Sequence, residues 1–234
     1  MKKALNILLI LLLSNIPFCF GQNINQFDAN GKRHGIWKKN FENTKVIRYE
    51  GMFEHGKEVG EFKFYINMKN KPVLSATRVF NPDDNISEVT FYASTGKVIS
   101  EGKMDGKKYI GTWKFYQKNS KKLLILENYN SLGQLHGARE VYYANGQVAE
   151  KSNYSNGELD GLYTWYSEPG ILIKELMYKN GSLDGPTKVY DATGSVIIEG
   201  QYKNGQKVGI WTYYEAGEIT EEKNFSKRIN PNKK

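Results

Sequence analysis

The sequence predicts an all-β protein, an elongated antiparallel sheet of about eight stacked β-hairpins of about 24 residues each. The segments KNGSLDGPTKVY (179–190) and KNGQKVGIWTYY (203–214) share Lys-Asn-Gly, a second glycine four residues later and a final tyrosine. These landmarks recur at a constant spacing of 24 residues, and no stretch of the array has a helical pattern. The recurring residues are Gly133, Gly157, Gly181 and Gly205, then Gly137, Gly161, Gly185 and Gly209, and finally Tyr142, Tyr166, Tyr190 and Tyr214.

Each unit reads as a β-hairpin. After the second glycine the side chains alternate, with Trp211 and Tyr213 predicted on one side and Ile210, Thr212 and Tyr214 on the other. Alternation of aromatic and β-branched residues between glycines is typical of strands, and Asn-Gly favours a tight turn. A two-stranded hairpin is marginal in water, so each hairpin is expected to bury its aromatic side against its neighbours.

The earlier units are looser copies, beginning at Gly31, Gly56 and Gly106. Between the last two, residues 95–102 match residues 193–200, so a third, degenerate unit is predicted there. In that unit Asn-Pro-Asp-Asp (81–84) replaces the leading glycines. The array is expected to occupy residues 22–226, with the polar run 221–234 as a C-terminal cap and 227–234 as a basic tail.

The first 21 residues predict a secretory signal peptide. A basic start precedes an apolar run at 4–13, which is shorter than the about 20 residues of a membrane span. We expect cleavage between Gly21 and Gln22, and export to the periplasm, the outer surface or the medium. Lipoprotein processing at Cys19 is disfavoured because Phe18 occupies a place where a small residue is expected.

Cleavage would remove two lysines, no acid and the single cysteine, which lowers the net charge from +8 to +6. A mature chain without cysteine has no disulfide, thiol nucleophile or thiolate metal site.

The segment from Asn204 to Tyr214 follows the pattern Asn-Gly-x-x-x-Gly-x-Trp-x-x-Tyr and resembles the bacterial variant of the MORN repeat. The resemblance extends over most of the mature chain. It implies a twisted antiparallel sheet of successive hairpins, and a role in protein–protein contacts or in binding membrane phospholipids. Bacterial members are also described as antitoxins, which leaves a toxin-neutralising role as a remote alternative for an exported chain.

Residues suited to catalysis or metal binding are scattered. His34, His55 and His136 lie in different units at turn positions, and Asp160 and Asp184 precede repeat glycines, so all five are interpreted as turn residues. The pair Asp83-Asp84 interrupts the repeat and leaves calcium binding as an alternative. No Gly-x-Ser-x-Gly elbow or phosphate-binding loop occurs. We therefore expect no catalytic, cofactor or metal residues and no enzyme, with a carbohydrate hydrolase as the remote alternative.

Aromatic residues recur at two places in the unit. The second place after the repeat glycine is predicted to form the core, and the fifth place to form a tyrosine ladder that joins hairpins. The second-place residues are Trp37, Phe62, Trp113, Tyr163 and Trp211, and the fifth-place residues are Tyr65, Tyr116, Tyr142, Tyr166, Tyr190 and Tyr214.

The alternative for the tyrosines is a partly open face whose rings, flanked by lysines, bind a partner. The flanking lysines are Lys38, Lys63, Lys114 and Lys188. The candidate partner-binding residues are Trp113, Tyr116, Tyr142, Trp165, Tyr166, Tyr190, Trp211 and Tyr214.

The favoured function is a non-enzymatic scaffold of the cell envelope that binds another protein or a second copy of itself. The positive charge and the mixture of aromatic residues and lysines leave an anionic phospholipid or a cell-wall glycan as the alternative ligand. Nucleic acid is not expected as a partner, because export separates the chain from it and the charge is modest.

Overall fold

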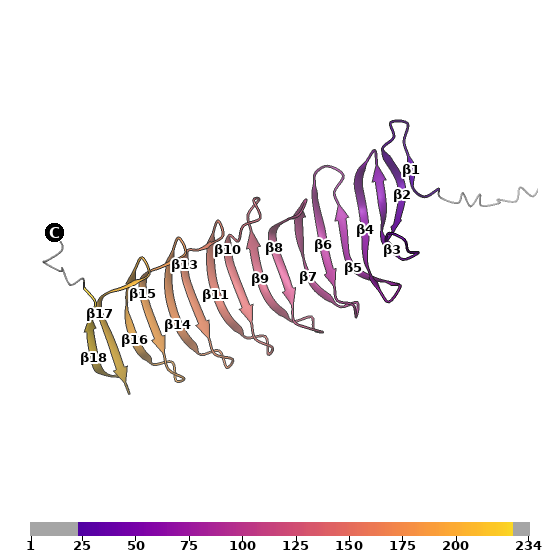
Figure 1. Cartoon of the computed structure of the whole chain (residues 1–234). Helices are drawn as coiled ribbons and strands as arrows, with labels where there is room; N and C mark the ends of the chain where they lie inside the picture. Colours follow the sequence, from indigo (N-terminus) through magenta and orange to yellow (C-terminus); the bar gives the residue numbers. More distant parts are fainter. Residues whose placement is uncertain (1–22, 227–234) are drawn as a thin grey trace, which may run out of the picture.

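The computed structural model describes residues 23–226 as one open, 18-stranded antiparallel sheet without a helix. The strands stand side by side in chain order, so that the two ends of this part of the chain lie at opposite ends of an elongated body (Figure 1). The predicted all-β fold of stacked hairpins is confirmed. The strands are β1 (Gln26–Phe27), β2 (Arg33–Asn40), β3 (Ile47–Glu54), β4 (Lys57–Met68), β5 (Lys71–Phe80), β6 (Ile86–Tyr92), β7 (Val98–Asp105), β8 (Lys108–Tyr116), β9 (Leu123–Tyr129), β10 (Gly137–Tyr142), β11 (Val148–Ser155), β12 (Glu158–Leu159), β13 (Gly161–Tyr166), β14 (Leu172–Lys179), β15 (Ser182–Tyr190), β16 (Val196–Lys203), β17 (Gln206–Glu215) and β18 (Glu218–Asn224).

Eight hairpins follow the short strand β1. The first is β2–β3 and the last is β17–β18; β12 and β13 act as one strand interrupted at Asp160. Each return strand then pairs with the first strand of the next hairpin, as β16 does with β17. The number of hairpins agrees with the predicted number of units. Since no described residue is helical, no described segment is a helix that could cross a membrane.

The Asn-Gly turns join one hairpin to the next. Asn204 and Gly205 both have positive φ, at 48° and 77°, and Asn180 and Gly181 repeat this at 47° and 75°. Two successive residues with positive φ form the tight turn that matches the twist of antiparallel strands. This is the reason that the predicted turn residues recur in the unit.

In the units that keep it, the second glycine bends its strand. Between β7 and β8, Glu101 pairs with Lys114 and Lys103 pairs with Ile110, so three residues of β8 face Gly102 alone. Gly111 starts this bulge with a φ of 63°. Such extra residues kink a strand. Here the kink allows the Tyr109 ring to stack on Trp113, with 3.8 Å between their centroids.

The most deeply buried aromatic rings of the core lie directly on glycines. Trp113, Phe62 and Trp211 are 0–2 % exposed. Each ring covers a glycine of the preceding return strand; a Cβ on Gly102 would lie 2.5 Å from the Trp113 ring. Gly51 and Gly200 have the same relation to Phe62 and Trp211. We call the sheet surface that carries these rings the core face. The side of the sheet that carries Tyr116 is called the tyrosine face.

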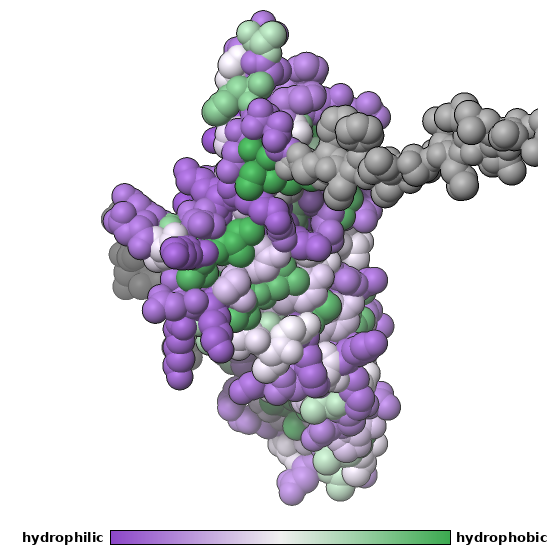
Figure 2. All heavy atoms as spheres, turned by 90° about the vertical axis from the view of Figure 1, so that its right-hand side faces the viewer, coloured by the Kyte–Doolittle hydropathy of each residue, from purple (hydrophilic) through white to green (hydrophobic). Residues whose placement is uncertain are grey.

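At the N-terminal edge, no return strand precedes β2 among residues 23–226. The residues before β2 make the contacts that a return strand makes in the other hairpins. The Trp37 indole donates a hydrogen bond to the Gln26 carbonyl (3.0 Å), as Trp113 does to Lys103. The amide oxygen of Asn25 accepts the backbone N–H of Lys38 at 2.8 Å. In Figure 2, which views the molecule from this end, hydrophilic side chains surround smaller hydrophobic patches. The sequence pattern did not reveal this closing segment.

The C-terminal edge is the strand β18, all of whose residues are exposed. The predicted polar cap was placed too late, because it began at Glu221, inside a strand that pairs with β17. Glu218, Glu221 and Glu222 give this edge the charge with which sheet proteins discourage further strand pairing. The predicted signal peptide, Cys19 and the basic tail 227–234 lie outside the described residues.

The degenerate third unit is held by a local turn. Asp84 accepts hydrogen bonds from the Ile86 N–H (2.8 Å) and the Asn81 amide (3.2 Å). These bonds connect β5 to β6 without the usual glycines. Among residues 23–226, no group of three or more His, Cys, Asp or Glu side chains is arranged to hold a metal ion.

Candidate functional site

The eight candidate partner-binding residues lie on opposite faces of the sheet. Trp113, Trp165 and Trp211 belong to the core face, and the five tyrosines (Tyr116, Tyr142, Tyr166, Tyr190 and Tyr214) belong to the tyrosine face. Trp113 and Trp211 are buried and therefore core residues, whereas Trp165 is 43 % exposed. No single surface can thus contain all eight.

Four of the fifth-place tyrosines join neighbouring hairpins. The Tyr116 hydroxyl donates a hydrogen bond to Glu101 on the preceding hairpin at 2.6 Å. Tyr65 with Glu50, Tyr190 with Glu175 and Tyr214 with Glu199 repeat this bond at 2.5–2.7 Å. The predicted tyrosine ladder between hairpins is confirmed for these four tyrosines, whose hydroxyls are committed to carboxylates of the chain itself. Tyr142 donates instead to Glu140 of its own strand and does not join two hairpins.

The ladder changes the acidity of both partners. Burial, together with the hydrogen bond to Glu101, raises the pKa of Tyr116 to about 12, and the pKa of Tyr190 rises to about 12 for the same reasons beside Glu175. The hydrogen bond from Tyr65 lowers the pKa of Glu50. The neutral tyrosine and the ionised glutamate are therefore favoured together.

Lysines and glutamates alternate beside the ladder. Lys38 contacts Glu50 at 3.1 Å, and Lys188 contacts Glu199 at 3.6 Å. In one unit the signs are exchanged, with Glu140 on the first strand and Lys151 on the return strand, 3.2 Å apart. The row has five lysines (Lys38, Lys63, Lys114, Lys151 and Lys188) and six glutamates (Glu50, Glu101, Glu140, Glu175, Glu199 and Glu222). The predicted lysines therefore do not give this face a positive charge.

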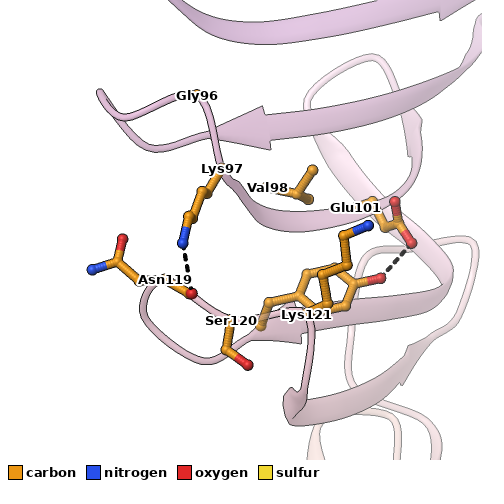
Figure 3. Close-up of a pocket in the computed structure, with 8 residues that line it drawn as sticks. Gly96, Lys97, Val98, Glu101, Asn119, Ser120 and Lys121 are labelled. Carbon is orange, nitrogen blue, oxygen red and sulfur yellow. Dashed lines mark hydrogen bonds between the residues drawn. The ribbon is translucent and has the colours of Figure 1, made fainter.

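A hollow of about 610 Å³ opens on the tyrosine face between the third and fourth hairpins. Val98, Glu101 and Tyr116 line it, and Lys97 donates a hydrogen bond to the Asn119 carbonyl (2.9 Å) across its rim (Figure 3). Two of its polar side chains, Glu101 and Tyr116, are bonded to each other. This hollow is thus a widened part of the ladder, shaped by the longer turn after β8.

The core face contains a second hollow, of about 660 Å³, where polar residues replace the core rings. In the three units from β10 to β16 the second place is occupied by Arg139, Tyr163 and Thr187. The Arg139 guanidinium donates to Glu127 at 2.9 Å and to Glu150 at 2.8 Å. This network was not predicted from the sequence. The signal for it was Arg139, a charged residue at a place in the unit that is aromatic in most other units.

Tyrosines complete this polar network. Tyr129 donates to Glu127 at 2.5 Å and Tyr163 donates to Glu150 at 3.0 Å. Burial lowers the pKa of Arg139, but the hydrogen bond that Arg139 donates to Glu127 and the charges of both glutamates outweigh it, so the pKa is raised overall. Burial and the hydrogen bond to Glu150 raise the pKa of Tyr163 to about 12. Arg139 is therefore a fixed cation between two fixed carboxylates.

Trp165 forms one wall of this hollow. Its indole is 43 % exposed, and the Lys174 ammonium lies 5.8 Å from the ring centroid. Trp165 pairs with Glu150 on one side and Lys174 on the other. The hollow is therefore lined by an open aromatic surface next to both acidic and basic groups.

The histidines and aspartates before the repeat glycines support the turns of the next unit. His136 Nδ1 accepts the Asn156 N–H at 3.4 Å, and Asp160 accepts the Asn180 N–H at 3.2 Å. His34 does the same for the His55 N–H at 3.5 Å, which brings the two imidazoles to 4.9 Å. The interpretation as turn residues is thus confirmed, with the detail that the supported turn belongs to the following hairpin.

The comparison with protein families agrees with this architecture. Residues 135–156, 159–180 and 183–204 match the MORN repeat variant. Each matched segment starts two residues before a bulge glycine and ends at the asparagine of the next Asn-Gly turn. No curated protein matches the chain. The predicted resemblance to the MORN repeat is confirmed over these three consecutive hairpins.

Proposed function

We propose that this chain is a non-enzymatic, exported scaffold that binds a protein partner along the tyrosine face in the cell envelope. The main support for this proposal is that the tyrosine face is long, regular and almost neutral, because its lysines alternate with glutamates. Exposed apolar side chains stand beside the charged row. They are Met52 (49 % exposed), Val79 (48 %), Leu162 (43 %) and Ile210 (57 %). Apolar residues within a polar, aromatic surface are characteristic of protein interfaces.

The balance of charges favours protein over anionic lipid as the partner. Attraction to an anionic membrane requires an excess of lysine or arginine on the contacting surface. On the tyrosine face the ammonium groups of Lys38 and Lys188 are already beside carboxylates. A toxin to be neutralised would be one special case of a protein partner.

The proposal that the chain is not an enzyme rests on the occupation of its polar groups. Glu127 and Glu150, which lie in the core-face hollow, both accept hydrogen bonds from Arg139 and from a tyrosine. Carboxylates bonded in this way are suited to holding a shape rather than to transferring protons.

The test is capture of the partner with surface variants. The tagged chain is exposed to envelope extract, and the captured protein should bind stoichiometrically. The double variant Leu162→Glu and Ile210→Glu should lose it, because two charges would interrupt the apolar side chains of the tyrosine face. Leu132→Glu is the matched control, since Leu132 is 66 % exposed in the turn between β9 and β10. Equal capture by all three proteins would overturn the proposed surface.

Export is tested separately. The chain produced in a bacterial host should be recovered outside the cytoplasm with Gln22 as its first residue, as measured by mass spectrometry. An intact N-terminus in the cytoplasmic fraction would contradict the export part of the proposal.

A further inference from the structure

We propose that the hollow on the core face is a binding site for a neutral glycan, with one pyranose ring stacked on Trp165. The site lies on the opposite side of the sheet from the surface proposed for the protein partner, so the two proposals are independent. Three features of the hollow support a glycan: its aromatic surface, its charge and its rigidity.

The first feature is the exposure of Trp165. The fourth-place residues Phe91 and Phe115 pack against the buried ring of Trp113. In the unit of the equivalent Trp165 the second place is occupied by Tyr163 instead of a buried tryptophan, and 43 % of the surface of Trp165 remains exposed. A planar, open indole matches the C–H face of a pyranose ring, which is flat and apolar.

The second feature is the balance of charge. The hollow contains two cations, Arg139 and Lys174, and two anions, Glu127 and Glu150. A phosphate headgroup or an acidic peptide would meet the two carboxylates, and a basic peptide would meet the two cations. A neutral ligand with many hydroxyl groups can donate to the carboxylates and accept from the cations. Tyr154 and Tyr178 add two hydroxyl-bearing side chains to the lining.

The third feature is rigidity. Arg139 is held by Glu127 and Glu150 at 2.9 and 2.8 Å, and these carboxylates are held in turn by Tyr129 and Tyr163. Groups fixed before binding lose little freedom when a ligand arrives. The volume of about 660 Å³ is within the range of about 300–1,000 Å³ that is common for small-molecule sites. The hollow therefore has the volume of a specific small-molecule site, and its polar groups are already fixed in position.

The experiment is titration of the full chain with four neutral tetrasaccharides: cellotetraose, maltotetraose, mannotetraose and the N-acetylglucosamine tetramer. Binding is followed by calorimetry and by tryptophan fluorescence. We expect at least one to bind and to change the emission of the exposed Trp165. Because the ligand is neutral, the dissociation constant should not change with salt concentration.

Two variants locate the site. Trp165→Ala should weaken binding at least about tenfold, and Trp165→Phe should give an intermediate value because the smaller ring still offers a stacking surface. Tyr213→Ala is the matched control: Tyr213 has the same place in the last hairpin, with Lys223 5.2 Å from its ring, but lies outside the hollow. It should bind as the unaltered chain does.

Three results would overturn the proposal. The first is that none of the four tetrasaccharides binds at about 10 mM, which corresponds to less than about 3 kcal/mol. The second is unchanged binding by Trp165→Ala, and the third is an equal loss in Tyr213→Ala. Leu162→Glu with Ile210→Glu should leave glycan binding intact, so failure of the protein-partner proposal is distinguishable from failure of this one.

Discussion

The Trp113 indole occupies the space that a side chain at Gly102 would fill. The indole lies so close to the Gly102 backbone that a Cβ there would stand 2.5 Å from Cδ2 of the ring. Trp113 is 0 % exposed and its indole N–H donates to the Lys103 carbonyl at 2.8 Å. Glycine is therefore required at position 102 because a side chain there has no room. At Gly111, by contrast, the backbone conformation favours glycine, since its φ is 63°. Because Gly102 leaves room for the indole, a sheet of a single layer is able to bury this tryptophan.

The first prediction is that Gly102→Ala lowers the free energy of unfolding by about 1–3 kcal/mol, because an inserted methyl group overpacks the core. Denaturant unfolding measures the change. Ser152→Ala is the control, since Ser152 occupies the equivalent place under Tyr163 and already has a Cβ. A double variant, Gly102→Ser with Trp113→Tyr, copies the Ser152–Tyr163 pair and should be more stable than Gly102→Ser alone. Strictly additive effects would contradict the proposed fit.

The second prediction concerns alkaline pH. Burial and a glutamate partner raise the pKa of Tyr65, Tyr116 and Tyr190 to about 12. A tyrosine in the unfolded chain ionises near pH 10. The ladder therefore contributes its full stability below about pH 10 and loses it as the pH rises through about 12. The absorbance of tyrosinate should show a class of tyrosines that ionises only as the sheet unfolds.

The control for this prediction is Tyr190→Phe, which should lose part of the late-ionising class and be less sensitive to pH above 10. A single titration near pH 10 for all tyrosines, with the fold intact, would show that the hydroxyl–carboxylate bonds are not formed.

The third prediction is that Arg139→Met lowers the free energy of unfolding by roughly 2–4 kcal/mol at neutral pH, because Glu127 and Glu150 lose the cation between them. Denaturant unfolding at neutral pH measures this difference. Lys188→Met is the control: its contact with Glu199 is long (3.6 Å) and exposed, and its cost should be within about 1 kcal/mol. Similar costs for the two variants would contradict the special role of Arg139.

The fourth prediction uses the histidine that supports a turn. Nδ1 of His136 accepts the Asn156 N–H at 3.4 Å, so His136→Ala should lower the free energy of unfolding by about 0.5–1 kcal/mol through loss of this acceptor. His136→Asp should keep the acceptor, as Asp160 does for Asn180, and should be more stable than His136→Ala in denaturant unfolding. Equal stabilities of the two variants would contradict a role of His136 in supporting the turn.

The repeated residues made the fold predictable. Period-two alternation, the Asn-Gly turns and the constant spacing predicted the hairpins, the core rings such as Trp113 and the tyrosine ladder. These features depend on local backbone preferences and on contacts between neighbouring units, which a sequence records directly. The carboxylate partners, by contrast, lie one strand away, and their register depends on the bulge at the second glycine.

The candidate site was less predictable because it depends on departures from the repeat. Arg139 breaks the aromatic column, and its partners Glu127 and Glu150 come from two different strands. Trp165 was grouped with the tyrosines, whereas the fourth place belongs to the core face. The closing role of Asn25 and Gln26 was also missed, since two residues contain no periodicity.

The pairing of every hairpin with its neighbours in the chain has a consequence for how the protein is made. Nothing at the C-terminal end is needed to complete the first hairpins, since β2 already has its partner in residues 25–27 and β3. A polypeptide that emerges slowly from a ribosome or from a membrane pore could thus fold from its leading end, one hairpin after another. Each newly folded hairpin would present an edge strand on which the next hairpin pairs.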